Sequence, residues 1–169
     1  MDTMDSYKVD LKSMQDDAVS HRWILDDNFF SAVNGAEISK GHLDVTLEVM
    51  RKPERYELDF QLDGTVKVQC DRCLELMDFP IHTEKSLTVK MGEEFEDDGG
   101  DVITIPEDSG VVDTAWYMYE MAALEIPIRH VHPEGECNKE VMRHLNGQDS
   151  EEHVDPRWAA LAKLKNNNK

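Results

Sequence analysis

The sequence has few of the features that mark secreted or membrane-spanning proteins. It contains three cysteines in 169 residues, so at least one thiol has no disulfide partner within the chain. The longest largely apolar stretch, MAALEIPI at 121–128, is far shorter than the roughly 20 residues of a membrane span. No basic segment followed by an apolar stretch marks the N-terminus as a secretory signal. We therefore expect a cytoplasmic protein with reduced thiols and no membrane contact.

Basic side chains are also scarce. The chain has 18 Lys and Arg against 36 Asp and Glu, which gives a formal net charge of −18. A surface with this charge repels phosphate backbones, so it disfavours direct, sequence-independent binding of nucleic acid. A role with RNA would need a local basic patch, or a basic protein as the immediate partner.

The motifs of common enzyme classes are missing as well. The sequence has no phosphate-binding glycine loop, no G-x-S-x-G and no H-E-x-x-H. The acidic, glycine-rich segment 92–101 lacks the alternating ligands and the closing glutamate of a calcium loop, so we interpret it as a mobile loop. Nothing in the sequence calls for catalysis, and we expect a protein that is not an enzyme.

What the sequence does contain is a regular β pattern. Apolar and polar residues alternate in several segments, and Asp63-Gly64 is typical of a two-residue hairpin turn. A helical spacing of apolar residues follows at 115–126, with Thr114 as the expected cap and Pro127 as the expected stop. A shorter helix within 21–33 would be capped by Asp26 or Asp27. The pattern predicts an α+β fold, an antiparallel meander or partly open barrel with a packed helix, with strands in segments 7–11, 42–50, 55–62, 65–70, 79–91 and 102–105.

Changes in composition predict three parts of the chain. Residues 1–145 would form one α+β domain, which carries the acidic loop near 92–101. Residues 146–155 are polar and are interpreted as a linker. Residues 156–169 would form a basic amphipathic, helical tail in which Trp158 belongs to a narrow apolar stripe.

The pair Cys70 and Cys73 lies between two strand-like stretches, at the tip of a predicted hairpin. A redox Cys-x-x-Cys needs its first thiol at the N-terminus of a helix, and Asp71 would raise a thiol pKa instead of lowering it. Two isolated thiols are the other simple interpretation. The hairpin context is also that of a zinc knuckle.

A second cluster favours the metal interpretation. His130, His132 and Cys137 lie in HVHPEGEC, an irregular segment after the predicted helix. Zinc prefers four tetrahedral nitrogen and sulfur ligands, which commonly arrive as two short-spaced pairs. We predict a structural zinc site of Cys70, Cys73, His132 and Cys137, with His130 as the competing fourth ligand. Arg72 would be either an ordinary surface residue or a donor to the thiolate sulfurs or to a partner.

Three stretches together resemble the YceD family of large ribosomal RNA subunit accumulation proteins. They are VQCDRCLELMDFPI, IPIRHVHPEGECN and DPRWAALAKLK, in this order, with LDDNFF before them. The resemblance implies a role in the accumulation of 23S rRNA and in large-subunit biogenesis. Family members carry either a cysteine pair or a His-x4-Cys arrangement at the second cluster, which favours His132 over His130.

The resemblance and the charge pattern lead to one main hypothesis and two alternatives. The chain would be a non-enzymatic assembly factor whose partner is 23S rRNA or a pre-ribosomal particle. RNA or partner contacts would come from Arg72 and from the tail residues Arg157, Trp158, Lys163 and Lys165; alternatively, the tail docks on its own domain or is disordered. The first alternative is an acidic chaperone or adaptor for a basic large-subunit ribosomal protein, and the second is a thiol oxidoreductase built on the Cys70–Cys73 pair.

Overall fold

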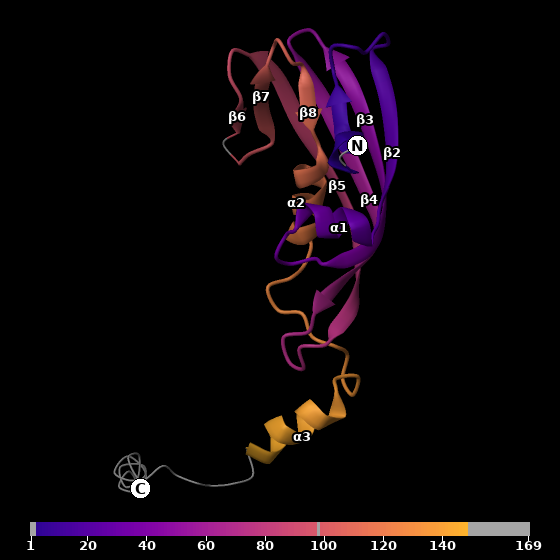
Figure 1. Cartoon of the computed structure of the whole chain (residues 1–169), viewed down its shortest axis with the longest axis vertical. Coiled ribbons are helices and arrows are strands. Elements are labelled where there is room, and N and C mark those ends of the chain that lie inside the picture. The colour runs from indigo at the N-terminus through magenta and orange to yellow at the C-terminus, as the bar shows by residue number, and fades with distance from the viewer. Residues whose placement is uncertain (1–2, 98, 149–169) are drawn as a thin grey trace, which may run out of the picture. The chain divides into compact units, whose positions relative to one another are not determined.

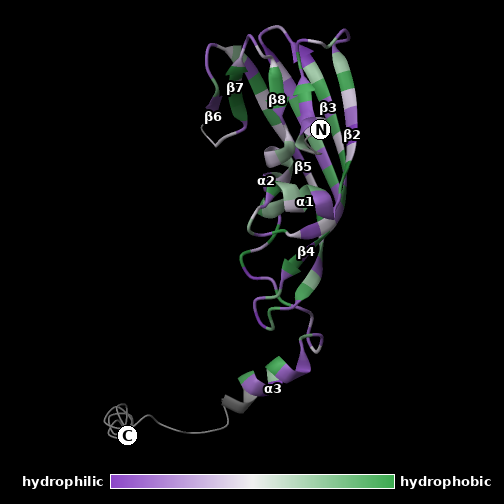
Figure 2. Ribbon diagram, in the orientation of Figure 1, coloured by the Kyte–Doolittle hydropathy of each residue, from purple (hydrophilic) through white to green (hydrophobic). Residues whose placement is uncertain are grey.

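The alternating residues between positions 40 and 92 form three long neighbouring strands. These are β3 (Lys40–Lys52), β4 (Arg55–Gln69) and β5 (Leu76–Gly92). Along β3, Leu43, Val45 and Leu47 are buried, whereas the residues between them are more exposed. Figure 2 shows this banding of apolar and polar residues along the strands. The long strands therefore present one apolar face to the core.

The computed structural model describes residues 3–97 and 99–148 of the chain. Within these ranges, the other elements are the 3-10 helix η1 (Thr3–Tyr7), β1 (Lys8–Asp10), β2 (Ala18–Leu25), α1 (Asp27–Val33), β6 (Glu96–Asp97), β7 (Val102–Pro106), β8 (Val111–Asp113), α2 (Ala115–Leu124) and α3 (Lys139–Gln148).

Six of the described strands form one sheet in the order β2-β3-β4-β5-β7-β6. The pairs from β2 to β5 are antiparallel, β7 runs parallel to β5, and β6 returns antiparallel to β7. Strands β1 and β8 form a separate antiparallel pair. The predicted α+β class with an antiparallel meander is confirmed. The sequence did not predict β2, or the parallel pairing of β7 with β5.

Two helices cover one face of the sheet (Figure 1). Helix α1 packs on β2 and β3, α2 packs on β4 and β5, and the two helices contact each other. Phe29 and Phe30 of α1 and Met118 of α2 are buried in the core. As predicted, Asp26 caps α1, because its carboxylate accepts hydrogen bonds from the N–H groups of Asn28 and Phe29. These bonds hold the pKa of Asp26 below its usual value.

The hairpin turn predicted at Asp63-Gly64 is wrong. Both residues lie inside β4, where Gly64 pairs with Leu43 on one side and Ile81 on the other. The turn between β3 and β4 is formed by Pro53 and Glu54. Gly64 has a φ of +151°, and a Cβ atom there would lie 2.2 Å from the backbone oxygen of His42. Gly64 therefore allows the backbones of β3 and β4 to approach closely, and it does not form a turn.

The cap predicted for α2 is also different. Thr114 precedes the helix, but its hydroxyl donates to the backbone oxygen of Tyr7 at 2.6 Å and makes no capping bond. Asp113 accepts the N–H of Ala115 instead. The helix ends at Leu124, three residues before Pro127. Thr114 thus ties the start of α2 to η1, next to the short β1–β8 pair.

The chain divides into two units, residues 1–131 and residues 132–169. In the second unit, α3 extends to Gln148, into the segment predicted as a linker. The rest of that linker and the whole predicted tail, 156–169, lie outside the described residues, so this division into domain, linker and tail stays a prediction. Among the described helices, none is long and apolar enough to cross a membrane.

Candidate metal centre

The first cysteine pair lies in the tight connection between β4 and β5. The N–H of Cys70 donates to the oxygen of Glu75, and the N–H of Leu74 donates to the oxygen of Cys70, both at 2.9 Å. The N–H of Arg72 points at the Sγ of Cys70, at 3.4 Å. An N–H directed at sulfur favours the thiolate, the form that binds a metal. The backbone of this connection therefore holds both thiols on the inside of one loop.

Leu74 has an unusual backbone conformation that makes the loop possible. Its φ is +62°, in the left-handed region, which costs a residue with a Cβ roughly 1–2 kcal/mol. The side chain is 65% exposed, so little packing offsets this strain. Such strain persists only where surrounding contacts fix the conformation, and it often lies at functional sites. In this loop, it turns the chain back into β5 directly after the second thiol.

Asp71 fastens the segment that follows α2 to this loop. Its N–H donates to the backbone oxygen of His130 at 3.0 Å, and its carboxylate accepts the N–H of His130 at 2.7 Å. The ring Nδ1 of His130 lies 3.0 Å from the oxygen of Pro127, and its Nε2 lies 3.9 Å from the Asp71 carboxylate. His130 thus acts through its backbone, and its ring already has neighbours other than the thiols.

The second pair of candidate ligands lies in the unit that begins at His132. The Sγ of Cys137 is 4.0 Å from the Nδ1 of His132, across a turn in which the N–H of Glu136 donates to Pro133. Gly135 supplies a φ of +89° in that turn. Since Cα atoms of consecutive residues are about 3.8 Å apart, His132 lies within about 7.6 Å of the fastened His130. The second pair therefore begins two residues after His130, whose backbone is hydrogen-bonded to Asp71.

Cys70, Cys73, His132 and Cys137 form a group that could hold a metal ion. Each offers one ligand atom, and these atoms lie within 4.8 Å of one another. All three cysteines are buried. In a tetrahedral zinc site with Zn–S bonds of about 2.3 Å, neighbouring ligand atoms are about 3.8 Å apart, so only small shifts are needed. Three thiols and one imidazole are also a donor set that suits zinc, and the residues fit the ion.

The other predicted site residues are Arg72 and the four residues of the tail, and the structure gives little support for a role of any of them. Arg72 is half-buried between the cysteines, and its guanidinium makes no ion pair with any described residue. Arg157, Trp158, Lys163 and Lys165 lie outside the described residues. Neither cysteine of the first pair lies at a helix N-terminus, because Cys70 follows β4 and Cys73 precedes β5. The arrangement thus lacks the helix dipole that a redox pair uses.

The sequence profile of a protein family matches residues 58–165, well over half of the chain. The family is described as large ribosomal RNA subunit accumulation protein YceD. The chain belongs to the YceD family. The matched range contains all four candidate ligands and most of the predicted tail, whereas η1 and the segment from β1 to β3 precede it. Comparisons with curated proteins and with solved structures find no match.

Membership of the YceD family confirms the resemblance and the function that it implies, a part in the accumulation of large ribosomal subunit RNA. Sequence reasoning missed the two hydrogen bonds between Asp71 and His130. No local pattern in the sequence predicts that Asp71 bonds to a residue 59 positions away. The left-handed conformation of Leu74 was missed for a similar reason, because a glycine is the usual signal for it.

Proposed function

We propose that this YceD protein supports 23S rRNA accumulation by binding a pre-ribosomal particle in the cytoplasm, and that it performs no catalysis. The observation that carries this proposal is the group of three cysteines and one histidine. Four protein ligands would fill every position of a tetrahedral ion, which leaves none for a reacting water or a substrate. Such a site would stabilise the folded conformation, and a binding protein needs a stable conformation of its binding surface.

The ion at this site would be zinc, held by Cys70, Cys73, His132 and Cys137. When bound, it would supply a crosslink between two distant parts of the chain. The N–H of Arg72 would favour the thiolate of Cys70, and the bonds between Asp71 and His130 would keep the second pair of ligands within reach. Binding free energy at such a site is folding free energy. The metal would therefore add to the hydrogen bonds between Asp71 and His130 that hold the segment after α2.

Contact with RNA would come from the C-terminal segment. Arg157, Lys163, Lys165 and Lys169 are basic, Trp158 offers a stacking surface, and no acid follows Asp155. Arg72 would add a basic side chain next to the metal site. Filter binding to 23S rRNA fragments tests this assignment, with a chain truncated after Asp155 beside the full chain. Truncation should weaken binding and lower its salt dependence; equal affinity and equal salt slope would remove the tail from the proposal.

The proposal as a whole is tested in cells that lack the protein. The ratio of 23S to 16S rRNA should fall, and the wild-type chain should restore it. Cys70→Ser and His132→Ala should fail to restore it, whereas His144→Ala, a change of an exposed histidine on α3, should restore it fully. Immunoblots show whether each variant is present. A normal ratio of 23S to 16S rRNA in cells that lack this protein would contradict the proposal.

The net charge of −18 favours one second candidate function, an acidic adaptor for a basic large-subunit ribosomal protein without direct RNA contact. Co-purification before and after nuclease treatment separates the two. Association that survives complete digestion of RNA supports the adaptor. Association that is lost with the RNA supports the main proposal.

A further inference from the structure

Helix α2 is apolar on the side that faces away from the sheet as well as on the side that packs against it. Its sequence, AWYMYEMAAL, contains one charged residue, Glu120. Met118 and Ala122 are buried, yet Trp116 is 54% exposed and Leu124 is 72% exposed. A helix that is apolar all round is normally covered all round. The outer side of α2 is therefore an apolar surface that no described residue of the first unit covers.

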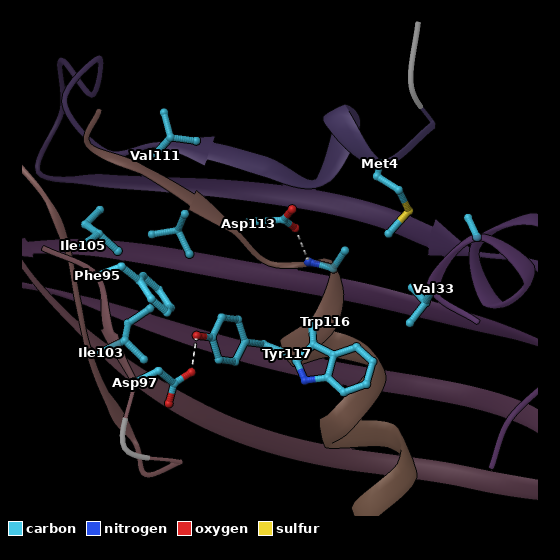
Figure 3. A pocket seen from close by; sticks show the side chains of 13 residues that line it. Met4, Val33, Phe95, Asp97, Ile103, Ile105, Val111, Asp113, Trp116 and Tyr117 are labelled. Atoms are coloured by element: carbon cyan, nitrogen blue, oxygen red, sulfur yellow. Dashed lines mark hydrogen bonds between the residues drawn. The ribbon is translucent and has the colours of Figure 1, made fainter. Parts of the chain in front are cut away.

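A hollow of about 510 Å³ lies beside the first turn of α2. Its walls are mainly apolar and come from several elements, among them Met4, Val33, Phe95, Ile103 and Trp116 (Figure 3). Phe95 is 59% exposed, so this aromatic side chain stands at the rim and does not close the hollow. The hollow has room for one or two large apolar side chains of another molecule.

Trp116 also lines a second hollow of about 430 Å³. This one runs along the later turns of α2 and is lined by Ala123, Leu124 and the fully exposed Ile128. Trp116 lines both hollows, and we name the two hollows together the α2 surface. Two apolar hollows that share one aromatic side chain suit a short peptide segment with several apolar anchors, as in helix-in-groove recognition.

The carboxylates that line the two hollows make them acidic. Asp97 and Asp113 line the first hollow, and Glu37 and Glu120 line the second, whereas no lysine or arginine of the described part of the chain lines either one. Asp97 accepts a hydrogen bond from the hydroxyl of Tyr117 at 2.6 Å, which fixes its carboxylate at the rim of the first hollow (Figure 3). A ligand of this surface has to combine large apolar side chains with positive charge.

We propose that the α2 surface binds a short basic amphipathic segment of a partner protein. An apolar anchor would fill the hollow beside Phe95 and Trp116, and flanking Lys or Arg would face Asp97 and Glu120. RNA fits poorly, because its phosphates would meet the same carboxylates. A second copy of the chain also fits poorly, because each copy carries a net charge of −18 and an acidic rim. The inference does not depend on the metal site or on RNA contact by the tail.

The test uses the full-length protein and a synthetic peptide of about 14 residues, composed of lysine and leucine with one tryptophan. Fluorescence anisotropy in about 150 mM salt measures its affinity, so that long-range attraction is screened. Trp116→Ala and Phe95→Ser should each weaken binding about tenfold or more. Ile24→Ala, which shortens an equally exposed apolar side chain on β2, should change it less than about twofold.

A pair of charge variants separates docking from general attraction. Asp97→Asn with Glu120→Gln removes two charges at the surface, and Asp44→Asn with Glu48→Gln removes two on exposed positions of β3. The first pair should weaken binding at least about fivefold more than the second. Equal effects of the two pairs, or no effect of Trp116→Ala and Phe95→Ser, would overturn the proposal.

Two other occupants give their own results. If truncation after Asp155 tightens peptide binding about fivefold or more, the chain's own basic tail covers the α2 surface, and the partner proposal is overturned. If sedimentation shows a dimer that Trp116→Ala dissociates, a second copy covers it, and the proposal is equally overturned. A monomer whose peptide affinity is unchanged by the truncation supports a partner protein. A normal ratio of 23S to 16S rRNA in cells without the protein, together with peptide binding that depends on Trp116 and Phe95, would contradict the proposed function and leave this inference standing.

Discussion

Replacing Tyr119 by phenylalanine should destabilise the protein by about 2–3 kcal/mol. The Tyr119 hydroxyl accepts hydrogen bonds from the backbone N–H groups of Ile38, at 3.2 Å, and Glu37, at 3.0 Å. The Ile38 N–H is buried, and a buried donor without a partner costs about 1–3 kcal/mol. The Glu37 N–H is partly exposed and regains water, so its loss adds roughly 0.5–1 kcal/mol. These bonds connect α2 to the segment that leads into β3, and they hold the α2 surface in place.

Urea denaturation followed by circular dichroism measures this change. With a urea slope of about 2 kcal/mol per molar, the midpoint should fall by about 1 M. Tyr117→Phe is the matched control, because it removes a hydroxyl from the same helix that donates only to the exposed Asp97. It should cost less than about 1 kcal/mol. A Tyr119→Phe midpoint within about 0.2 M of wild type would show that the two hydrogen bonds to Tyr119 do not stabilise the fold.

Three further substitutions test other parts of the structure. Gly64→Ala should lower the free energy of unfolding by at least about 2 kcal/mol, because the added Cβ would overlap the neighbouring strand. Gly100→Ala is the control, because a Cβ there meets no atom within 4 Å; it should change the free energy of unfolding by less than about 0.5 kcal/mol in the same urea titration. Leu74→Gly should raise the free energy of unfolding by about 0.5–1 kcal/mol, since glycine adopts the left-handed conformation without strain; a lower midpoint would contradict this. Asp26→Ala should lower the urea midpoint at pH 7. Because the folded-state pKa of Asp26 is depressed, its contribution is present above the ordinary value of 3.8 and is lost as the pH falls through the depressed pKa, so the two midpoints should converge in acid.

Strands β3 and β4 were predictable because apolar residues at alternate positions on one face of each strand are buried. The alternation at 42–50 and 55–62 marks that face directly, and no tertiary information is needed to recognise it. The turn signal at Asp63-Gly64 failed because β4 is paired on both sides there, and the two ladders outweigh a local preference. The pairing of β7 with β5 depends on a crossover through the acidic segment, and no local pattern in the sequence specifies it.

The candidate ligands could be chosen from sequence because all three cysteines and two of the seven histidines occur in two short-spaced clusters. The choice between His130 and His132 needed more than spacing. In the structure, the backbone of His130 is bonded to Asp71, and it is His132 that lies 4.0 Å from a thiol. These contacts depend on the path of the chain after α2, where it returns to the connection between β4 and β5. That path is determined by the tertiary fold and not by a local sequence pattern.

The structural metal site is tested most directly by the zinc content of protein purified without chelator, measured by elemental analysis together with thermal unfolding. We expect one zinc per chain, and we expect Cys70→Ser and His132→Ala to lose the metal and much of the thermal stability. His130→Ala should keep the zinc. A wild-type zinc content near zero, with a melting temperature that added zinc does not change, would contradict the structural metal site.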